Sequence, residues 1–367
     1  MRACWQRIDG VSSVWYRYHG NDTIHCFLIK NMPTIQDVAK LAGVAPITVS
    51  RVLSNSGYAS EETRSRVESA AATLGYVPNT LARGLRSKRT QTLALVMTDI
   101  TNPFFTMIAR GVEDAASNSG YTVIFCNTDE SEEEQEKYIN ILVQKQVDGV
   151  LLVPASSNSK SIKFLQSNHV PMVLLDRRIP GIEADVIRCD SEKAGYDLTR
   201  HLIELGHRQI VTISGPREVS TSQDRVSGYE RAMKEAGLED SIRVYFGSYT
   251  QTSGYELSGQ ALTLEPRPTA IFGTNNFISI GMLKALKDAG LGVPKDISVV
   301  GFDDLPAAMV VDPVLTVAAQ PAYEMGCQAT ELLMKRNASN IVESSRDIVL
   351  PTELIIRRSS GPPAVKS

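Results

Sequence analysis

The chain has 367 residues, and its 38 basic and 41 acidic side chains give a net charge of −3. Its five cysteines have no Cys-x-x-Cys spacing and its five histidines have no metal-ligand spacing. We therefore expect thiols buried in a reducing cytoplasm, and we expect no metal, no cofactor, no membrane association and no enzyme chemistry.

The first 31 residues differ from the rest of the chain. They contain both tryptophans, have no clean periodicity and lack the continuous apolar run of a signal peptide. We expect residues 1–31 to be a non-native or disordered extension, with translation starting at Met32.

Two short helices are predicted next. Thr34 can cap the first helix, with Asp37 three residues later, and Gly43 can end it in a left-handed conformation. Two residues later, Pro46 suits the first position of a second helix. Two helices joined by a tight glycine turn predict a helix-turn-helix, whose second helix would enter the major groove of DNA.

A third helix follows, capped by Ser60 and closed by Gly75. Short helix pairs rich in Ala, Val and Leu are often only core packing, so the residues around this pair decide between the two interpretations. Charge favours the DNA-binding one, because residues 32–91 carry a net +4 whereas residues 92–367 carry −9. A basic head on an acidic body is expected of a protein that grips phosphates at one end.

The remaining body alternates short apolar runs with amphipathic segments. Runs of Val, Ile and Leu between helices predict parallel sheets covered on both faces, and hence two doubly wound α/β lobes with a ligand cleft between them. The strands are expected at 93–97, 122–127, 149–153, 172–176, 186–189, 209–214, 244–246, 270–273 and 298–302. The helices are expected at 105–119, 132–145, 191–205, 224–236, 252–262 and 278–289.

The chain contains the motifs Thr34-Ile-Gln-Asp-Val-Ala39, Gly43-Val44, Thr48-Val-Ser-Arg-Val52, Gly75-Tyr-Val-Pro-Asn79, and Ala82 with Leu85. Together they resemble those of the lac repressor (LacI/GalR) family of transcription regulators. The resemblance covers residues 33 to about 358 and implies a type I periplasmic-binding-protein-like body behind the helix-turn-helix head. It implies a head at 32–78, a hinge helix and linker at 79–91, and an effector-binding and dimerisation domain at 92–358. The N-lobe would comprise 92–189 and 321–346, and the C-lobe 190–320 and 347–358, with crossovers near 189–190, 319–321 and 346–348.

The same resemblance implies a DNA-contacting set on the head and hinge. Pro46, Ile47 and Arg51 would read base edges, and Arg51 can bind a guanine edge through two hydrogen bonds. Thr48 and Ser50 suit phosphates, and Thr34 belongs to the same set. Leu85 matches a leucine that wedges into the centre of the site from the minor groove, against which Asn79 and Ala82 would lie.

Cleft residues follow from the predicted strand ends and from matching family positions. The resemblance implies that they hold an effector. Their polar groups would pair with its hydroxyls, since a buried hydroxyl left without a partner costs about 1–3 kcal/mol. Asp99 and Asp176 could instead be helix caps or interlobe ion pairs. The expected set is Asp99, Asn102, Phe104, Asp176, Arg177, Arg225, Asn275, Asp303 and Gln320.

Two positions depart from the family pattern. Asn275-Asn276 stands where members often have Asn-Asp, which removes one charge near the cleft. Ala322 stands where the protein that gives the family its name has a stacking aromatic residue. The effector's identity therefore cannot be transferred to this chain from the resemblance.

The function expected is that of a cytoplasmic, nucleoid-associated repressor that binds a palindromic double-stranded DNA operator as a homodimer. A small effector, a sugar or sugar derivative, would control its affinity for the operator. Residues 359–367 are expected to be a disordered tail without the leucine heptads of a tetramer. Two alternatives are an architectural or constitutive DNA-binding protein with a vestigial cleft, and a periplasmic-type sugar receptor.

Overall fold

The computed structural model describes residues 33–54, 57–77, 89–158, 160–305, 314–338 and 344–364. It also describes the strands β1 (Val14–Trp15) and β2 (Phe27–Leu28), which pair antiparallel within the predicted extension. The chain divides into two compact units, Met1–Arg86 and Ser87–Ser367. The hinge positions Asn79, Ala82 and Leu85 lie outside the described residues.

The first unit contains three packed helices: α1 (Ile35–Ala42), α2 (Pro46–Leu53) and α3 (Glu61–Leu74). Thr34 and Asp37 form a reciprocal capping box at the start of α1, and Gly43 ends it with a φ of 66°. The apolar faces of the three helices meet in one small core. That core contains Val38, Ala39, Ala42, Val49, Val52, Val67, Ala70 and Ala71.

The second unit begins with an N-lobe, a six-stranded sheet in the order β13-β7-β6-β5-β3-β4. Its pairings are all parallel. Helices α5 and α12 pack together on one face, and α6 packs with α7 on the other. The strands are β3 (Thr92–Met97), β4 (Thr122–Asn127), β5 (Gly149–Leu152), β6 (Met172–Leu175), β7 (Asp185–Cys189) and β13 (Asp347–Leu350). The helices are α5 (Pro103–Asn118), α6 (Glu132–Gln144), α7 (Lys160–Ser167) and α12 (Ala322–Ala338).

The C-lobe repeats this plan with the strand order β14-β12-β11-β10-β8-β9, of which β14 alone is antiparallel to its neighbour. Helices α8 and α9 form one packed pair and α10 and α11 another. The strands are β8 (Ile210–Ser214), β9 (Arg243–Phe246), β10 (Ala270–Gly273), β11 (Ser298–Phe302), β12 (Thr316–Ala319) and β14 (Glu353–Ile355). The helices are α8 (Ser191–Glu204), α9 (Ser220–Glu235), the 3-10 helix η1 (Glu239–Ser241), α10 (Gln251–Ala261) and α11 (Asn276–Asp288).

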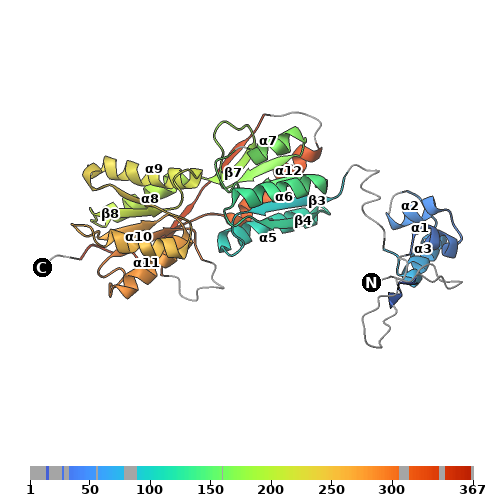
Figure 1. Cartoon of the computed structure of the whole chain (residues 1–367), viewed down its shortest axis with the longest axis horizontal. Helices are drawn as coiled ribbons and strands as arrows, with labels where there is room; N and C mark the ends of the chain where they lie inside the picture. Colours follow the sequence, from blue (N-terminus) through green and yellow to red (C-terminus); the bar gives the residue numbers. More distant parts are fainter. Residues whose placement is uncertain are drawn as a thin grey trace, which may run out of the picture. The chain divides into compact units, whose positions relative to one another are not determined.

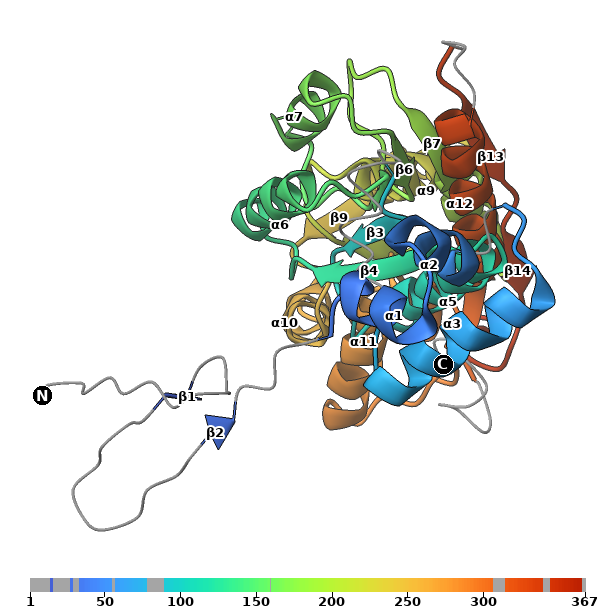
Figure 2. The ribbon, with the colours of Figure 1, turned by 90° about the vertical axis from the view of Figure 1, so that its right-hand side faces the viewer.

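The chain passes between the lobes three times, so α12 and β13 lie among N-lobe elements that precede them by well over a hundred residues (Figure 1). Figure 2 shows α12, β13 and β7 side by side. The first two crossovers fall at 189–191 and 319–322, as predicted. The third was predicted at 346–348, which is wrong. Asp347–Leu350 still pairs with β7 in the N-lobe, and the chain crosses at Pro351 and Thr352.

The predicted disordered tail is also wrong for residues 359–364. Ser359 is 1% exposed and its hydroxyl donates to Val299 O (2.6 Å) and accepts from Thr316 N (2.7 Å). Gly361 O lies 2.8 Å from Nε2 of the buried His207. Small polar residues are common in disordered segments, but here they supply hydrogen bonds to buried groups of the C-lobe. Residues 365–367 lie outside the described part.

Candidate functional site

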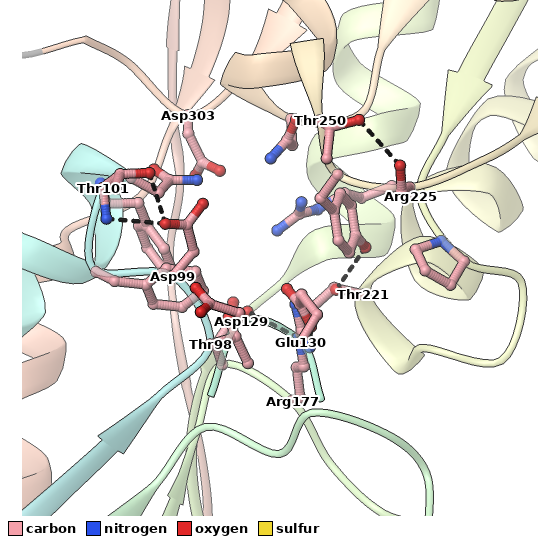
Figure 3. Close-up of a pocket in the computed structure, with 18 residues that line it drawn as sticks. Thr98, Asp99, Thr101, Asp129, Glu130, Arg177, Thr221, Arg225, Thr250 and Asp303 are labelled. Atoms are coloured by element: carbon pink, nitrogen blue, oxygen red, sulfur yellow. Dashed lines mark hydrogen bonds and ion pairs between the residues drawn. The ribbon is translucent and has the colours of Figure 1, made fainter. Parts of the chain in front are cut away.

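The two lobes enclose a cavity of about 420 Å³, which is within the usual size of small-molecule sites. It lies beyond the carboxyl ends of the parallel strands, where ligands bind in open α/β sheets. Figure 3 shows acidic, hydroxyl and arginine side chains around it. It is lined by Thr98, Asp99, Thr101, Asn102, Phe104, Phe105, Asp129, Glu130, Asp176, Arg177, Pro216, Thr221, Arg225, Ser248, Tyr249, Thr250, Asn275 and Asp303.

Four of the acidic lining residues have a left-handed backbone. The φ angles are 50° at Asp129, 58° at Glu130, 62° at Asp176 and 67° at Asp303. Asp176 follows β6 directly and Asp303 follows β11. Non-glycine residues rarely adopt this conformation, and those that do cluster at binding sites, where the surrounding structure holds the strain.

Arg225, on α9, is the central cation of the cavity. It is 3% exposed, donates from Nη1 to Thr274 O (2.8 Å), and its Cζ lies 3.7 Å from the centre of the Phe302 ring. Burial raises the pKa of Asp303 to about 6, although Arg225 and a hydrogen bond from Gln320 act to lower it. Burial also raises the pKa of Asp176, against the opposing charges of Arg225 and Arg177.

Arg177 is held within the N-lobe. Its Nη1 and Nη2 donate to the two carboxylate oxygens of Glu130 (2.6 and 2.7 Å), and Nη1 also donates to Pro154 O (2.9 Å). Its Cζ lies 5.5 Å from the centre of the Tyr249 ring, which belongs to the C-lobe. The charge of Arg177 is therefore already balanced by a neighbour.

Several buried polar atoms at the cavity have no hydrogen-bond partner among the described residues. Leaving such an atom unpaired costs about 1–3 kcal/mol, and a bound molecule that pairs with it recovers part of that cost. These atoms are Thr98 Oγ1, Asp176 Oδ1, Arg177 Nε, Arg225 Nε and, beside Asp303, Gln320 Oε1.

The structure brings eight of the nine predicted cleft residues together in the cavity wall. The ninth, Gln320, stands behind the wall and donates from Nε2 to Asp303 Oδ1 (2.6 Å). Asp99 also has a local role, because its Oδ1 accepts from the backbone and hydroxyl of Thr101. The residues that sequence reasoning missed include Asp129, Glu130, Tyr249 and Thr250. They follow β4 and β9, so the rule of strand ends could have found them.

Polar contacts also join the lobes around the cavity. Asn102 and Asn276 exchange two hydrogen bonds (3.1 and 2.9 Å). Arg178 donates from Nη1 and Nη2 to the two carboxylate oxygens of Asp224, and its backbone N–H donates to Ser220 Oγ (3.1 Å). Asn276, which stands where family members often have aspartate, thus places an amide in an interlobe contact. Its side chain is not part of the cavity wall.

In the first unit, the predicted DNA-reading face is open. Pro46 and Arg51 are exposed, Ile47 is 47% exposed, and Thr48 and Ser50 are half-buried. The Thr34 hydroxyl donates to Asp37 (2.7 Å) within the capping box. The face therefore offers one guanidinium group and an apolar surface at the start of α2.

Residues 34–79 match the family model described as bacterial regulatory proteins, lacI family. Residues 90–358, well over half of the chain, match the model for periplasmic binding proteins and the sugar binding domain of the LacI family. The chain belongs to the LacI family. It is therefore a transcriptional regulator with an effector-binding domain.

Curated LacI-family relatives align over nearly their whole length. The HTH-type transcriptional repressor PurR of Photobacterium profundum is 36% identical over 330 residues, 89% of this chain and 98% of that protein. The HTH-type transcriptional regulator DegA of Bacillus subtilis is 35% identical over 333 residues, 90% of this chain and 98% of that protein.

Solved LacI-family structures share the fold. The lac repressor dimer bound to operator and the anti-inducer ONPF has a TM-score of 0.78 at 26% identity, over 89% of this chain and 98% of that one. The transcriptional regulator CelR in complex with cellobiose has a TM-score of 0.68 at 33% identity, over 89% of this chain and 100% of that one. These likenesses confirm the predicted fold class. Among the described residues, none of the helices combines the length and apolar character that a membrane span needs.

Proposed function

We propose that this regulator is a cytoplasmic repressor that binds a near-palindromic DNA operator as a homodimer. Its affinity for the operator falls or rises when a sugar or sugar derivative occupies the cleft. One observation carries the proposal. The chain joins a helix-turn-helix with an open reading face to a cavity where several buried polar atoms have no partner among the described residues.

For the DNA half, Arg51 reads a guanine edge while Pro46 and Ile47 give apolar contacts, for example to a thymine methyl. Thr34, Thr48 and Ser50 position the head on phosphates. The hinge residues Asn79, Ala82 and Leu85 complete the contact in the minor groove, with Leu85 as the wedge. The lac repressor dimer solved with its operator supports operator binding by a dimer.

For the effector half, the cavity offers hydrogen-bonding groups and two aromatic walls from different lobes. Asp176, Asp303 and Arg225 hold hydroxyl groups, while Phe104 offers a flat face to a ring. Relatives solved with cellobiose and with ribose support a carbohydrate. Because the cavity is built from both lobes, a ligand that fits the closed form biases lobe closure, and such couplings are typically about 1–3 kcal/mol.

For the dimer, the N-lobe offers an apolar edge. β4 is the edge strand of its sheet, and Phe125 on it is 43% exposed. Ile100 and Met107 are 48% and 40% exposed on the adjoining loop and on α5, which packs against β4. A sheet edge with exposed apolar side chains favours pairing with a second copy.

The DNA half is tested by fluorescence anisotropy with a fragment from an inverted-repeat promoter and a random competitor. Arg51→Ala should weaken specific binding by about 1–3 kcal/mol and relax base preference at one position. Arg66→Ala removes the same charge from the exposed face of α3 and serves as the control. Equal losses in the two variants, or equal affinity of the wild-type chain for both DNAs, would refute sequence-specific repression.

The effector half is tested in the same assay. A sugar that occupies the cleft should change operator affinity by roughly five- to 150-fold. If operator binding is specific but responds to no compound that binds the chain, the protein is a constitutive DNA-binding protein with a vestigial cleft.

A further inference from the structure

We propose that the cleft takes an effector without an anionic group, one that donates hydrogen bonds to both Asp176 and Asp303, and that it excludes phosphates and carboxylates. This inference rests on the proposed function, since it names the chemical class of the effector at that same cavity.

The charges that line the cavity are strongly unequal. Five carboxyl groups face it, from Asp99, Asp129, Glu130, Asp176 and Asp303, against the two guanidinium groups of Arg177 and Arg225. Among the described lining residues there is no lysine or histidine. Sites that bind phosphate or carboxylate place arginine or lysine against the anion, so this wall has the opposite bias.

Both arginines already use Nη donors within the protein, and each keeps one buried donor, Nε, without a partner among the described residues. Arg177 is bound bidentately by Glu130. Arg225 donates to Thr274 O and stacks on the Phe302 ring, and its charge acts on both Asp176 and Asp303. An anionic ligand at Arg225 would therefore have two buried carboxyl groups beside it, where low polarity strengthens repulsion.

Asp176 and Asp303 instead require hydrogen-bond donors on the ligand. Asp176 is 6% exposed and its Oδ1 has no partner among the described residues. Asp303 is 5% exposed, and the hydrogen bond it accepts from Gln320 Nε2 goes to one of its two oxygens, Oδ1. Their strained backbone, with φ above 60° at each, holds both carboxyl groups at the cavity. Hydroxyl groups of a sugar or N–H groups of a base both meet this demand.

Helix starts could favour an anion. The start of α9, at Val219, has no side-chain cap, but the starts of α5 and α11 are capped. The α5 and α11 helices begin beside the cavity, and helix N-termini attract negative charge. The Asn102 side chain accepts from Phe104 N (3.0 Å), and the Asn275 side chain accepts from Ile278 N (2.8 Å). Asn276 further accepts from Phe277 N (2.7 Å). These first-turn donors are used within the protein.

The test measures the melting temperature of the full chain with matched compound pairs, followed by calorimetry on any that bind. Ribose is paired with ribose 5-phosphate, cellobiose with its aldonic acid, and purine bases with their monophosphates. Glucosamine is included as a positively charged compound. The sugar and base arms separate hydroxyl donors from N–H donors. A bound ligand raises the melting temperature in a saturable way.

The expected result is that a neutral or cationic compound binds and that its anionic partner is at least 100-fold weaker. Asp176→Asn and Asp303→Asn should each weaken that compound at least tenfold, and asparagine tolerates the left-handed backbone of both sites. Asp288→Asn, on the exposed end of α11, is the matched control and should change nothing.

An anionic compound that binds as tightly as its neutral partner, or tighter, overturns the inference while leaving effector control intact. So does a neutral binder whose affinity is unchanged by both aspartate substitutions. If no compound of any charge binds, the effector half of the proposed function fails and the inference falls with it. A base that binds in place of a sugar supports the inference and corrects the carbohydrate part of the proposed function.

Discussion

Asn102 and Asn276 are 174 positions apart in the chain and exchange amide hydrogen bonds, each Nδ2 donating to the other's Oδ1. Asn102 caps α5 in the N-lobe, and Asn276 is the first residue of α11 in the C-lobe. Both side chains are buried, at 4% and 1% exposure. The pair therefore ties lobe closure to the starts of two helices that border the cavity.

Breaking this pair should loosen the contact between the lobes. A double-mutant cycle of Asn102→Ala and Asn276→Ala, followed by urea unfolding of the full chain, should give a coupling of about 1 kcal/mol. The cycle also accounts for the α5 cap that Asn102→Ala removes. Asn140→Ala, on the exposed side of α6, should show no coupling to Asn276→Ala. A coupling near zero for the first pair would mean that the two amides act independently.

Asp303 should make stability depend on pH. Its pKa is about 6 in the folded protein against 3.8 for the unperturbed group, because burial disfavours the charge. The folded state binds the proton more tightly, so stability falls as the pH rises from about 4 to 6 and is level above that. The free energy of unfolding falls by at most about 3 kcal/mol across this range. Asp303→Asn removes this pH dependence. In urea unfolding, the free energy of unfolding of the variant should exceed that of the wild type only slightly near pH 4.5 and most above pH 7. A gain that is the same at both pH values would contradict this account.

The tail should stabilise the C-lobe. Ending the chain after Arg358 removes the Ser359 carbonyl and hydroxyl that pair with Val299 N and Thr316 N, and the Gly361 carbonyl that meets His207. Orphaned buried groups cost about 1–3 kcal/mol each, so we expect the unfolding midpoint to drop clearly. A chain that ends after Ala364 keeps these contacts and is the control. Identical urea curves for the two truncations would show that the docked segment adds no stability.

Phe125 should hold the dimer together if the β4 edge is its interface. Phe125→Glu places a charge on that edge and should convert the dimer to a monomer at micromolar concentration, as measured by light scattering after size-exclusion chromatography. Phe164→Glu, on α7 at the other face of the N-lobe, makes the same change at a similar exposure of 37%. A dimer that survives Phe125→Glu would place the interface elsewhere.

The central strands were predictable because burial on both faces leaves an uninterrupted apolar run. The prediction of 93–97 differs from β3 by one residue, and β8 and β11 are similarly close. The outer strands β13 and β14 are short and mostly exposed or half-buried, so the run from Asp347 to Ile355, which Pro351 divides, gave no clear apolar signal. Helix α12 was not predicted, although it covers one face of the N-lobe sheet.

The cleft residues were predicted from a rule about strand ends, and the rule found polar residues one or two positions beyond a recognised strand. Asp176, Asn275 and Asp303 were found in this way, whereas Glu130 and Tyr249 lie a few residues further along their loops. The partner of Asn276 could not be predicted, because that contact depends on how far the lobes close and not on any local pattern.

The three passages of the chain between the lobes mean that neither lobe is a continuous stretch of sequence. The N-lobe sheet is completed by a strand encoded more than 150 codons after its neighbour. A recombination event with one breakpoint inside this body would therefore divide at least one of the two sheets between the parental sequences. Such a protein should therefore acquire a new ligand preference by point substitutions around the cavity, or by exchange of the whole effector-binding domain while the helix-turn-helix domain stays unchanged.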